Sequence, residues 1–347
     1  MDETGLMSIR FVLVAAVFAM LPPCRSASAT GEEHNATNTL RPALSELACP
    51  TLPDAATADQ HFMPRQVFYT GKHDPDLKNM LFAKPGHEFA EGSIQIPSYP
   101  ADMSFFYYND TELEHSMFML DKVLSKAGVT GAFGAFRSLK PFAFKADLWR
   151  YSMLWACGGV YIDGKMMMSV DFEKWMKMKW RATHVGPQLL TCKDMMGTSI
   201  DAKTQLAKYG SHNETTLIWQ GFLVSTPSHP LLLAAIGQAI ENIQAKVYPD
   251  EGVLSALYIT GPGMLGRLIK TKRETEAADE KFPVNDIVHL VCEWGNHGQQ
   301  LISHFPKGDL FMMSDAKLHE SMRGNVQYSA KFKDHDVYVR RRRVRYR

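Results

Sequence analysis

Nine of the thirteen residues from Lys145 to Cys157 are apolar, and they fall on almost every face of a helix. Three of these side chains share one stripe at helical spacing: Trp149, Met153 and Ala156. We therefore expect a helix that is buried on most of its faces. The pair Gly158-Gly159 ends that helix, and the β-branched and aromatic run Val160 to Ile162 predicts a short buried strand directly after it.

Two charged residues interrupt the apolar helix. Asp147 and Arg150 lie three residues apart and therefore on the same face, and buried charges are costly unless they are paired or bound. Asp163 is the first residue beyond the predicted strand. Because ligands of open α/β sheets bind outside the carboxyl ends of the strands, we expect a crevice with Asp163 at its rim. The alternative is a structural ion pair of Asp147 with Arg150, and a plain turn at Asp163.

Further strands and helices follow from shorter patterns. Strands are expected through Val67 and Tyr69 and at 104–108, and helices are expected at 111–124 and at 231–243. A capping box of Asp110 or Thr111 with Glu114 is predicted for the helix at 111–124. The turn at 260–262 could begin a helix whose N-terminus binds an anion, although a plain turn also explains it. Residues 271–281 are expected to be a charged, solvated segment.

Composition and charge limit the class of protein. The chain has 347 residues, 45% of them hydrophobic, which is enough for one large α/β domain plus terminal segments. We place that domain at residues 62–325. A formal net charge of +1 excludes a general polyanion-binding surface, so no nucleic-acid partner is expected. The last stretch, 326–347, is expected to be a basic tail.

The N-terminal segment predicts targeting to the secretory pathway. Arg10 precedes the apolar run Phe11 to Leu21, and small residues follow at Ala27 to Ala29, as in a signal peptide that ends at residue 29. A short signal anchor, as in a type II membrane protein, is the alternative. Residues 30–61 have the composition of a stem or linker. We expect a protein of the Golgi or endoplasmic reticulum lumen, with a secreted protein as the second possibility.

Glycosylation sequons and cysteines are compatible with this compartment. Three sequons begin at Asn35, Asn109 and Asn213. Without the signal segment the chain keeps four cysteines: Cys49, Cys157, Cys192 and Cys292. Four cysteines allow three pairings, and the sequence does not choose among them. For Cys157, at the end of the apolar helix, a buried free thiol is an equally good interpretation.

The residues around the central helix and strand resemble a known family. The sequence reads Lys145-Ala146-Asp147, Arg150-Tyr151, Gly158-Gly159, Tyr161 and Asp163, which is similar to the core of the glycosyltransferases with an Asp-X-Asp motif in a sugar-binding region. Fungal outer-chain mannosyltransferases and the catalytic domains of large glucosylating toxins belong to this family. The segments 217–230 and 260–265 also resemble it. One position departs from the pattern, because Lys165 replaces the second acidic residue.

The resemblance implies a fold and an activity. It implies a GT-A-like α/β fold with a single mixed sheet flanked by helices. It also implies transfer of a hexose or N-acetylhexosamine from a nucleotide sugar, UDP- or GDP-linked, to a glycan, glycolipid or glycoprotein, with retention of configuration. In the family Mn²⁺ or Mg²⁺ bridges the diphosphate. Here Asp163 would hold the metal with help from elsewhere, or Lys165 would supply positive charge to the phosphates directly.

The same resemblance assigns roles to individual residues. The expected catalytic residues are Asp147, Arg150, Asp163 and Lys165, with Asp163 as the metal ligand. The expected substrate-binding residues are Tyr69, Thr70, Gly71, Tyr151, Tyr161, Gln220 and Gly221.

Two other classes of function are compatible with the sequence. The substitution at Lys165 fits a binding protein that keeps the nucleotide-sugar fold without turnover, although the other motif residues remain. A glycoside hydrolase is a weaker alternative, because it needs two carboxylates that flank the scissile bond, and the sequence offers no marked pair beyond Asp147 and Asp163.

Overall fold

The computed structural model describes residues 49, 66–70, 104–163, 166–168, 189–193, 217–250, 252–277, 287–294, 300–304, 309–314 and 328–339. All of them belong to one compact unit, residues 44–347. The expected signal segment, 1–29, lies outside the described residues. No helix in the described part of the chain is long and apolar enough to span a membrane.

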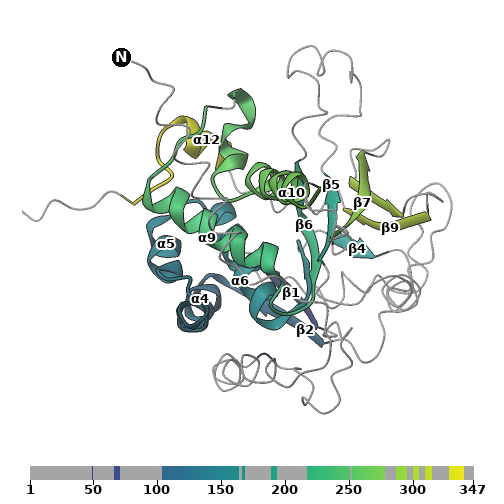
Figure 1. The fold of residues 1–347 in the computed structure, drawn as a ribbon, viewed down its shortest axis with the longest axis horizontal. Helices are drawn as coiled ribbons and strands as arrows, with labels where there is room; N and C mark the ends of the chain where they lie inside the picture. The colour runs from purple at the N-terminus through teal and green to yellow at the C-terminus, as the bar shows by residue number, and fades with distance from the viewer. Residues whose placement is uncertain are drawn as a thin grey trace, which may run out of the picture. The chain divides into compact units, whose positions relative to one another are not determined.

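A mixed sheet of nine strands forms the core of the described chain (Figure 1). The strands are β1 Gln66–Thr70, β2 Ser104–Tyr108, β3 Gly159–Ile162, β4 Met166–Met168, β5 Leu189–Lys193, β6 Ile218–Ser225, β7 Ile287–Trp294, β8 Gln300–His304 and β9 Asp309–Ser314. Their order is β2-β1-β3-β6-β5-β7-β8-β9-β4. The pairs β1/β2, β1/β3 and β5/β7 are parallel, and the other pairs are antiparallel. The predicted α/β class with one mixed sheet is confirmed.

The register of the parallel strands brings their carboxyl ends together. Phe68 of β1 lies opposite Phe106 of β2 on one side and Tyr161 of β3 on the other. Strand β3 is buried along its whole length, as its β-branched and aromatic residues predict. The residue after it, Asp163, therefore lies at the sheet edge where β1 and β2 also end.

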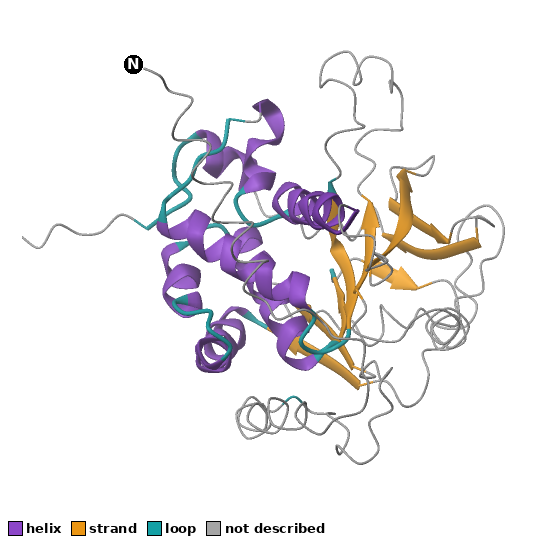
Figure 2. Ribbon diagram, viewed as in Figure 1, coloured by secondary structure: helices purple, strands orange, loops and turns teal. Residues whose placement is uncertain are grey.

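Helices pack beside the sheet (Figure 2). They are α4 Asp110–Lys126, α5 Ala132–Ser138, α6 Phe142–Cys157, α9 Pro230–Gln244, α10 Pro262–Ala277, α12 Tyr328–Lys333 and the 3-10 helix η1 Gly252–Tyr258. Helix α6 contacts β3, β6, α4 and α9, and 13 of its residues are buried, so it is the central helix that the apolar pattern predicted. It begins three residues before Lys145.

The start of α4 differs from the expected capping box. The N-cap is Asn109, whose Oδ1 accepts hydrogen bonds from the backbone N–H groups of Thr111 at 2.9 Å and Glu112 at 3.0 Å. Glu112 completes the box by accepting from the N–H of Asn109 at 2.9 Å. The prediction of Asp110 or Thr111 with Glu114 was wrong by one or two residues. The physical reason is that β2 ends at Tyr108 and leaves Asn109 extended, so the helix begins earlier.

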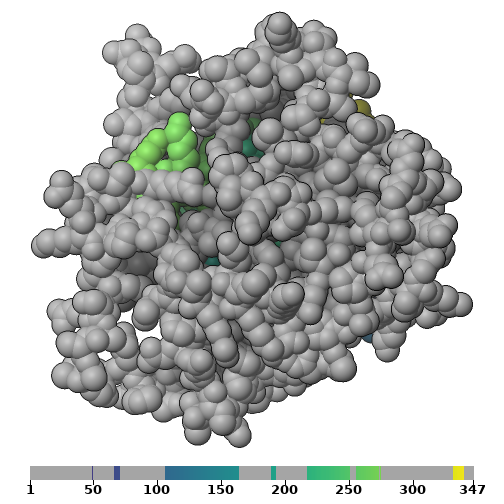
Figure 3. Space-filling model, turned by 90° about the vertical axis from the view of Figure 1, so that its right-hand side faces the viewer, coloured from purple at the N-terminus to yellow at the C-terminus, as the bar shows by residue number. Residues whose placement is uncertain are grey.

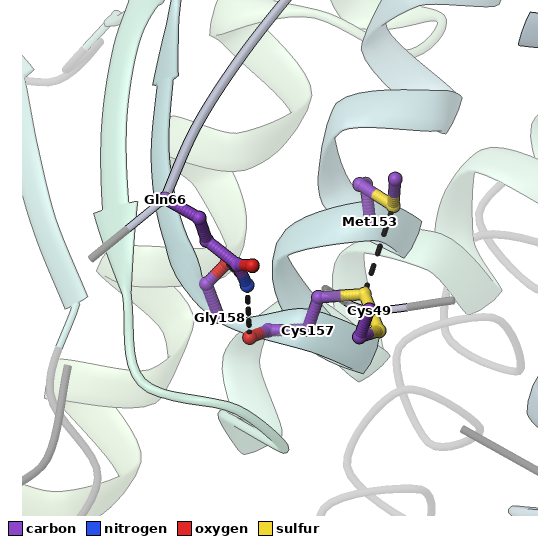
Figure 4. The surroundings of a disulfide bond; sticks show 5 residues. All are labelled: Cys49, Gln66, Met153, Cys157 and Gly158. Atoms are coloured by element: carbon purple, nitrogen blue, oxygen red, sulfur yellow. Dashed lines mark hydrogen bonds between the residues drawn. A yellow bond between two sulfur atoms is a disulfide. The ribbon is translucent and has the colours of Figure 1, made fainter. Parts of the chain in front are cut away.

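Two glycines make the turn between α6 and β3. Gly158 and Gly159 have φ values of +65° and +96°, which side chains disfavour. A Cβ on Gly159 would lie 2.7 Å from the carbonyl oxygen of Gln66. The Gln66 side chain in turn donates a hydrogen bond of 2.8 Å to the carbonyl of Cys157 (Figure 4). The Gly-Gly pair therefore lets β1 approach the end of α6 closely.

The surface end of α10 includes part of the segment that was expected to be solvated. The helix continues to Ala277, past Thr271, and forms a green patch on the face drawn in Figure 3. Lys270 and Glu274 are both exposed on it and form an ion pair of 3.8 Å. Within the expected segment Glu274 is exposed but Lys272 is buried, so the prediction of a solvated segment was wrong for Lys272, and the described part of the segment is helical.

Residues 328–339 pack on the helical side of the unit, beyond the domain boundary expected at residue 325. The N–H of Lys140 donates to the carbonyl of Val337 at 2.8 Å, and Tyr338 donates its hydroxyl hydrogen to the carbonyl of Val247 at 2.8 Å. Asp336 forms ion pairs with Lys140 and Lys331. The rest of the expected basic tail, 340–347, lies outside the described residues.

One disulfide bond joins Cys49 to Cys157, the last residue of α6 (Figure 4). It answers the pairing question for these two cysteines and excludes a free thiol at Cys157. Cys192 is buried in β5. The bond closes a sequence separation of 108 residues, so it ties the expected stem to the helix that precedes the Gly-Gly turn.

We predict that this disulfide stabilises the folded chain by about 2–5 kcal/mol, because it restricts the unfolded chain over a long loop. The variant Cys49→Ser should unfold at a lower urea concentration than the wild type. Added reductant should lower the stability of the wild type and leave Cys49→Ser unchanged. An equal response of both proteins to reductant would contradict the prediction.

Candidate active site

The site lies where β3 ends, and Asp163 is its most accessible charged group. The N–H of Asp163 donates to the carbonyl of Gly221 in β6 at 2.8 Å, which holds the residue against the sheet. Its side chain is 30% exposed. The sequence prediction that Asp163 stands just beyond a central strand is confirmed.

Arg150 connects the elements of the site. Its guanidinium lies 3.4 Å from Asp147 and 3.9 Å from Asp163. It also donates hydrogen bonds to the carbonyl of Ala146, at 3.2 Å, and to the carbonyl of Gln220 in β6. Only 6% of the side chain is exposed. These carboxylates and carbonyls therefore take the place of the water that the guanidinium loses on burial.

Asp147 is held on its other side by the turn before α10. Its Oδ1 faces Arg150, and its Oδ2 accepts a hydrogen bond of 2.9 Å from the Thr260 hydroxyl. The neighbouring Gly261 allows this approach, since a Cβ there would lie 3.0 Å from Oδ2. Tyr151, the next residue of α6 after Arg150, donates to the carbonyl of Thr260 at 2.9 Å. Asp147 and Tyr151, both on α6, therefore hydrogen-bond to the same turn residue, Thr260.

Burial sets the protonation of this cluster. Burial raises the pKa of Asp147 to about 6, although Arg150 and the hydrogen bond from Thr260 act in the opposite direction. Burial lowers the pKa of Arg150, but attraction to Tyr161 and to both carboxylates outweighs it, so this pKa stands above its ordinary value. Arg150 therefore stays a cation, and Asp147 takes up a proton just below neutral pH.

Tyr161 joins Arg150 to Asp163. The guanidinium carbon of Arg150 lies 4.4 Å from the centre of the Tyr161 ring, a cation–π contact. The Tyr161 hydroxyl donates to Asp163 Oδ1 at 3.0 Å. Burial raises the pKa of Tyr161 well above its ordinary range, so it remains a donor. In this arrangement Tyr161 orients the carboxylate.

The remaining predicted residues lie on neighbouring strands. Gln220 and Gly221 belong to β6 and take part through their carbonyls; Gln220 Oε1 is buried and has no hydrogen-bond partner in the described structure. Tyr69 and Thr70 lie at the carboxyl end of β1, where Thr70 donates its hydroxyl hydrogen to the carbonyl of Tyr108 at 2.7 Å. Gly71 and Lys165 lie outside the described residues.

The side chains available at the site determine whether it could hold the expected metal ion. Within the described ranges, no three His, Cys, Asp or Glu side chains gather closely enough to hold an ion by themselves. Asp163 does present one partly exposed carboxylate, and Mg²⁺ often takes one or two carboxylates together with substrate phosphates. Of the described residues, Asp163 is therefore the one that would hold such an ion. Such an ion would neutralise charge on the leaving group.

Sequence reasoning missed the part played by Thr260. For this turn we considered an anion-binding N-terminus of α10 or a plain turn, whereas in the structure the Thr260 side chain also holds Asp147. The available sequence signal was the Thr-Gly-Pro turn itself. Its partner lies 113 residues away, so no local pattern connects the two.

Comparisons with known proteins found one family match and a structural similarity. Residues 74–182 match the family described as "Glycosyltransferase sugar-binding region containing DXD motif". No curated protein matches the chain significantly. A solved structure named "PaToxG Glycosyltransferase" is similar with a TM-score of 0.37 and 12% identity, over 72% of this chain and 80% of that one.

A structural likeness of that size carries no argument on its own. The family match covers Asp147, Arg150, Tyr151, Tyr161 and Asp163, which are the residues that the structure brings together or ties to the same turn. The match confirms the resemblance seen in the sequence: residues 74–182 are similar to the DXD-containing sugar-binding region of glycosyltransferases.

Proposed function

We propose that the protein transfers a hexose or N-acetylhexosamine from a UDP- or GDP-sugar to a glycan, glycolipid or glycoprotein, with retention of configuration. The observation that carries the proposal is the position of Asp163. It is a partly exposed carboxylate at the carboxyl edge of the sheet, held from behind by Arg150 and Tyr161. Ligands of α/β sheets bind at this edge.

The proposed reaction needs two kinds of charge stabilisation. When the bond between the sugar and the diphosphate breaks, negative charge develops on the diphosphate and positive charge on the sugar ring. Asp163 stands where it can hold a divalent ion against the diphosphate. Lys165, two residues further on, would supply an ammonium to the same phosphates if the ion does not carry the whole charge.

Asp147 and Arg150 have a supporting role in this proposal. Their side chains are almost completely buried and form an ion pair. We expect this pair to fix the orientation of the Asp163 side chain, because Arg150 also contacts Asp163. Gln220 lies beside Arg150 and has a buried oxygen without a hydrogen-bond partner, which suits a hydroxyl or amide donor on a bound sugar. The donor sugar would then lie between Asp163 and β6.

We further propose that the protein works in the lumen of the Golgi or endoplasmic reticulum. The disulfide bond between Cys49 and Cys157 supports this, because disulfides persist in oxidising compartments. The N-terminal apolar segment and the three sequons agree with it. Secretion, or a type II membrane anchor, is the alternative.

A second candidate function is a nucleotide-sugar-binding protein without turnover. Lys165 at the second acidic position favours it, because a protonated lysine does not ligate a metal. The two functions separate when the purified chain is incubated with a panel of nucleotide sugars and Mn²⁺. Release of the nucleotide supports the transferase, whereas tight binding without release supports the binding protein.

The first prediction concerns Asp147. The variant Asp147→Asn should lower turnover by at least about tenfold, which corresponds to about 1.4 kcal/mol in the barrier, because Asp163 and the donor lose a fixed neighbour. Turnover is measured with the active nucleotide sugar. Asp250→Asn, the same change at an exposed residue, is the control. Unchanged specific activity in the folded fraction of Asp147→Asn would show a purely structural ion pair.

A second prediction uses the pKa of Asp147. The folded pKa of about 6 exceeds the ordinary 3.8, so the folded state binds this proton more tightly than the unfolded state. The resulting stability is fully present below the ordinary value and is lost as the pH rises through 6. Relative to Asp147→Asn, the wild type should lose about 3 kcal/mol in unfolding free energy over this range. Urea unfolding measures both proteins, and parallel pH curves would contradict the prediction.

The third prediction concerns the source of positive charge. If the ammonium of Lys165 faces the diphosphate, Lys165→Ala should lower turnover by at least about tenfold, and the wild type should keep measurable activity in EDTA. Lys126→Ala, at an exposed position on α4, is the control. Complete loss of activity in EDTA together with a silent Lys165→Ala would show that Asp163 and a metal carry the charge alone.

A further inference from the structure

The oxygen and the nitrogen of the Asn109 side-chain amide have different surroundings. Its Oδ1 accepts both hydrogen bonds that cap α4, at 2.9 and 3.0 Å. Its Nδ2 makes no hydrogen bond within the described part of the chain. Asp110, Thr111 and Glu112, which follow it, are exposed. Among the described residues, the fold therefore uses the oxygen of this side chain and leaves the nitrogen available.

Asn109 also begins the sequence Asn109-Asp110-Thr111, an acceptor sequon. We propose that Asn109 carries an N-linked glycan in the mature protein. In the reaction, Nδ2 attacks the first sugar of a lipid-linked diphosphate oligosaccharide. A bond forms between Nδ2 and the anomeric carbon, the bond from that carbon to the phosphate oxygen breaks, and Nδ2 loses one proton. The lipid diphosphate is the leaving group.

The cap of α4 tolerates this modification. A glycosylated amide keeps its oxygen, so Oδ1 still accepts from the N–H groups of Thr111 and Glu112. The capping box needs nothing from Nδ2, because its other half is the bond from the Asn109 backbone N–H to Glu112. The glycan can therefore be added without loss of helix stability.

The surface next to the sequon suits attached sugars. A hollow of about 410 Å³ starts at the sequon itself and continues along α4 to α5, lined by Asp110, Thr111, Glu114, His115, Phe118 and Phe133. Phe118 is 44% exposed, and its ring lies 5.4 Å from that of Phe133. Thr111 and Phe118 are two turns apart, about 10 Å along the helix. The inner sugars would cover this aromatic pair with their C–H faces and reach the carboxylates with their hydroxyls.

The inference rests on the proposed lumenal compartment and not on transferase activity. The full chain is expressed in a eukaryotic secretory host as wild type, Asn109→Asp and Thr111→Ser. Asp is as good an N-cap as Asn but accepts no glycan, and Ser keeps the sequon. Peptide-N-glycosidase in heavy-oxygen water converts glycosylated Asn to labelled Asp, and mass spectrometry locates the label.

We expect label at residue 109 in the wild type and in Thr111→Ser, and a faster-migrating Asn109→Asp. No label at Asn109 with label at Asn35 or Asn213 would overturn the inference and leave the compartment intact. No label at any sequon would overturn both. Nucleotide-sugar turnover is measured separately on Asn109→Asp, so a failure of the proposed function is distinguished from a failure at this site.

The contact with Phe118 is tested on the same protein. Enzymatic removal of the glycan should lower the melting temperature of the wild type more than that of Phe118→Ala, because only the wild type loses the sugar–ring contact. Equal shifts in the two proteins would overturn the packing of the glycan on the aromatic pair.

Discussion

The buried guanidinium of Arg150 is the interaction on which the site depends. A buried cation costs several kcal/mol unless charges and hydrogen-bond acceptors surround it. Here the acceptors come from different parts of the chain: Asp147 on the same helix, Asp163 after β3, and the carbonyl of Gln220 in β6. Satisfying one side chain therefore fixes the helix and both strands relative to each other. Asp147 adds the turn before α10 to this set, because a buried carboxylate needs partners as well.

The sequence predicts those parts of the site that lie within about twenty consecutive residues. The continuous apolar run gave α6, the Gly-Gly pair gave its end, and the position of Asp163 followed from the strand between them. The parts that sequence reasoning missed are contacts across long separations. The disulfide partner of Cys157 and the hydroxyl that holds Asp147 come from segments more than a hundred residues away. The shifted cap of α4 is a different case. Asn109, Asp110 and Thr111 are all suitable N-cap residues, and the position where β2 ends determines that Asn109 is the one used.

Exposure divides the family motif into two groups. The side chains of Asp147 and Arg150 are 10% and 6% exposed, whereas that of Asp163 is 30% exposed. The first group is almost completely enclosed by protein atoms, and the second reaches the carboxyl edge of the sheet, where ligands of α/β sheets bind. Tyr161 is buried and connects the two groups, since its ring packs on Arg150 and its hydroxyl orients Asp163. The site therefore presents one carboxylate, whose direction is set by a buried network.

This division changes what the motif can say about activity. Retention of Asp147, Arg150 and Tyr161 would argue for turnover if these residues served only the reaction. In the structure they also satisfy one another's charges in the core, so a protein without turnover would need them for folding. Their presence is consequently evidence for the sugar-binding fold rather than for catalysis. The evidence for catalysis must therefore come from a measurement of turnover, and of the two described motif carboxylates Asp163 is the one exposed enough to reach a ligand.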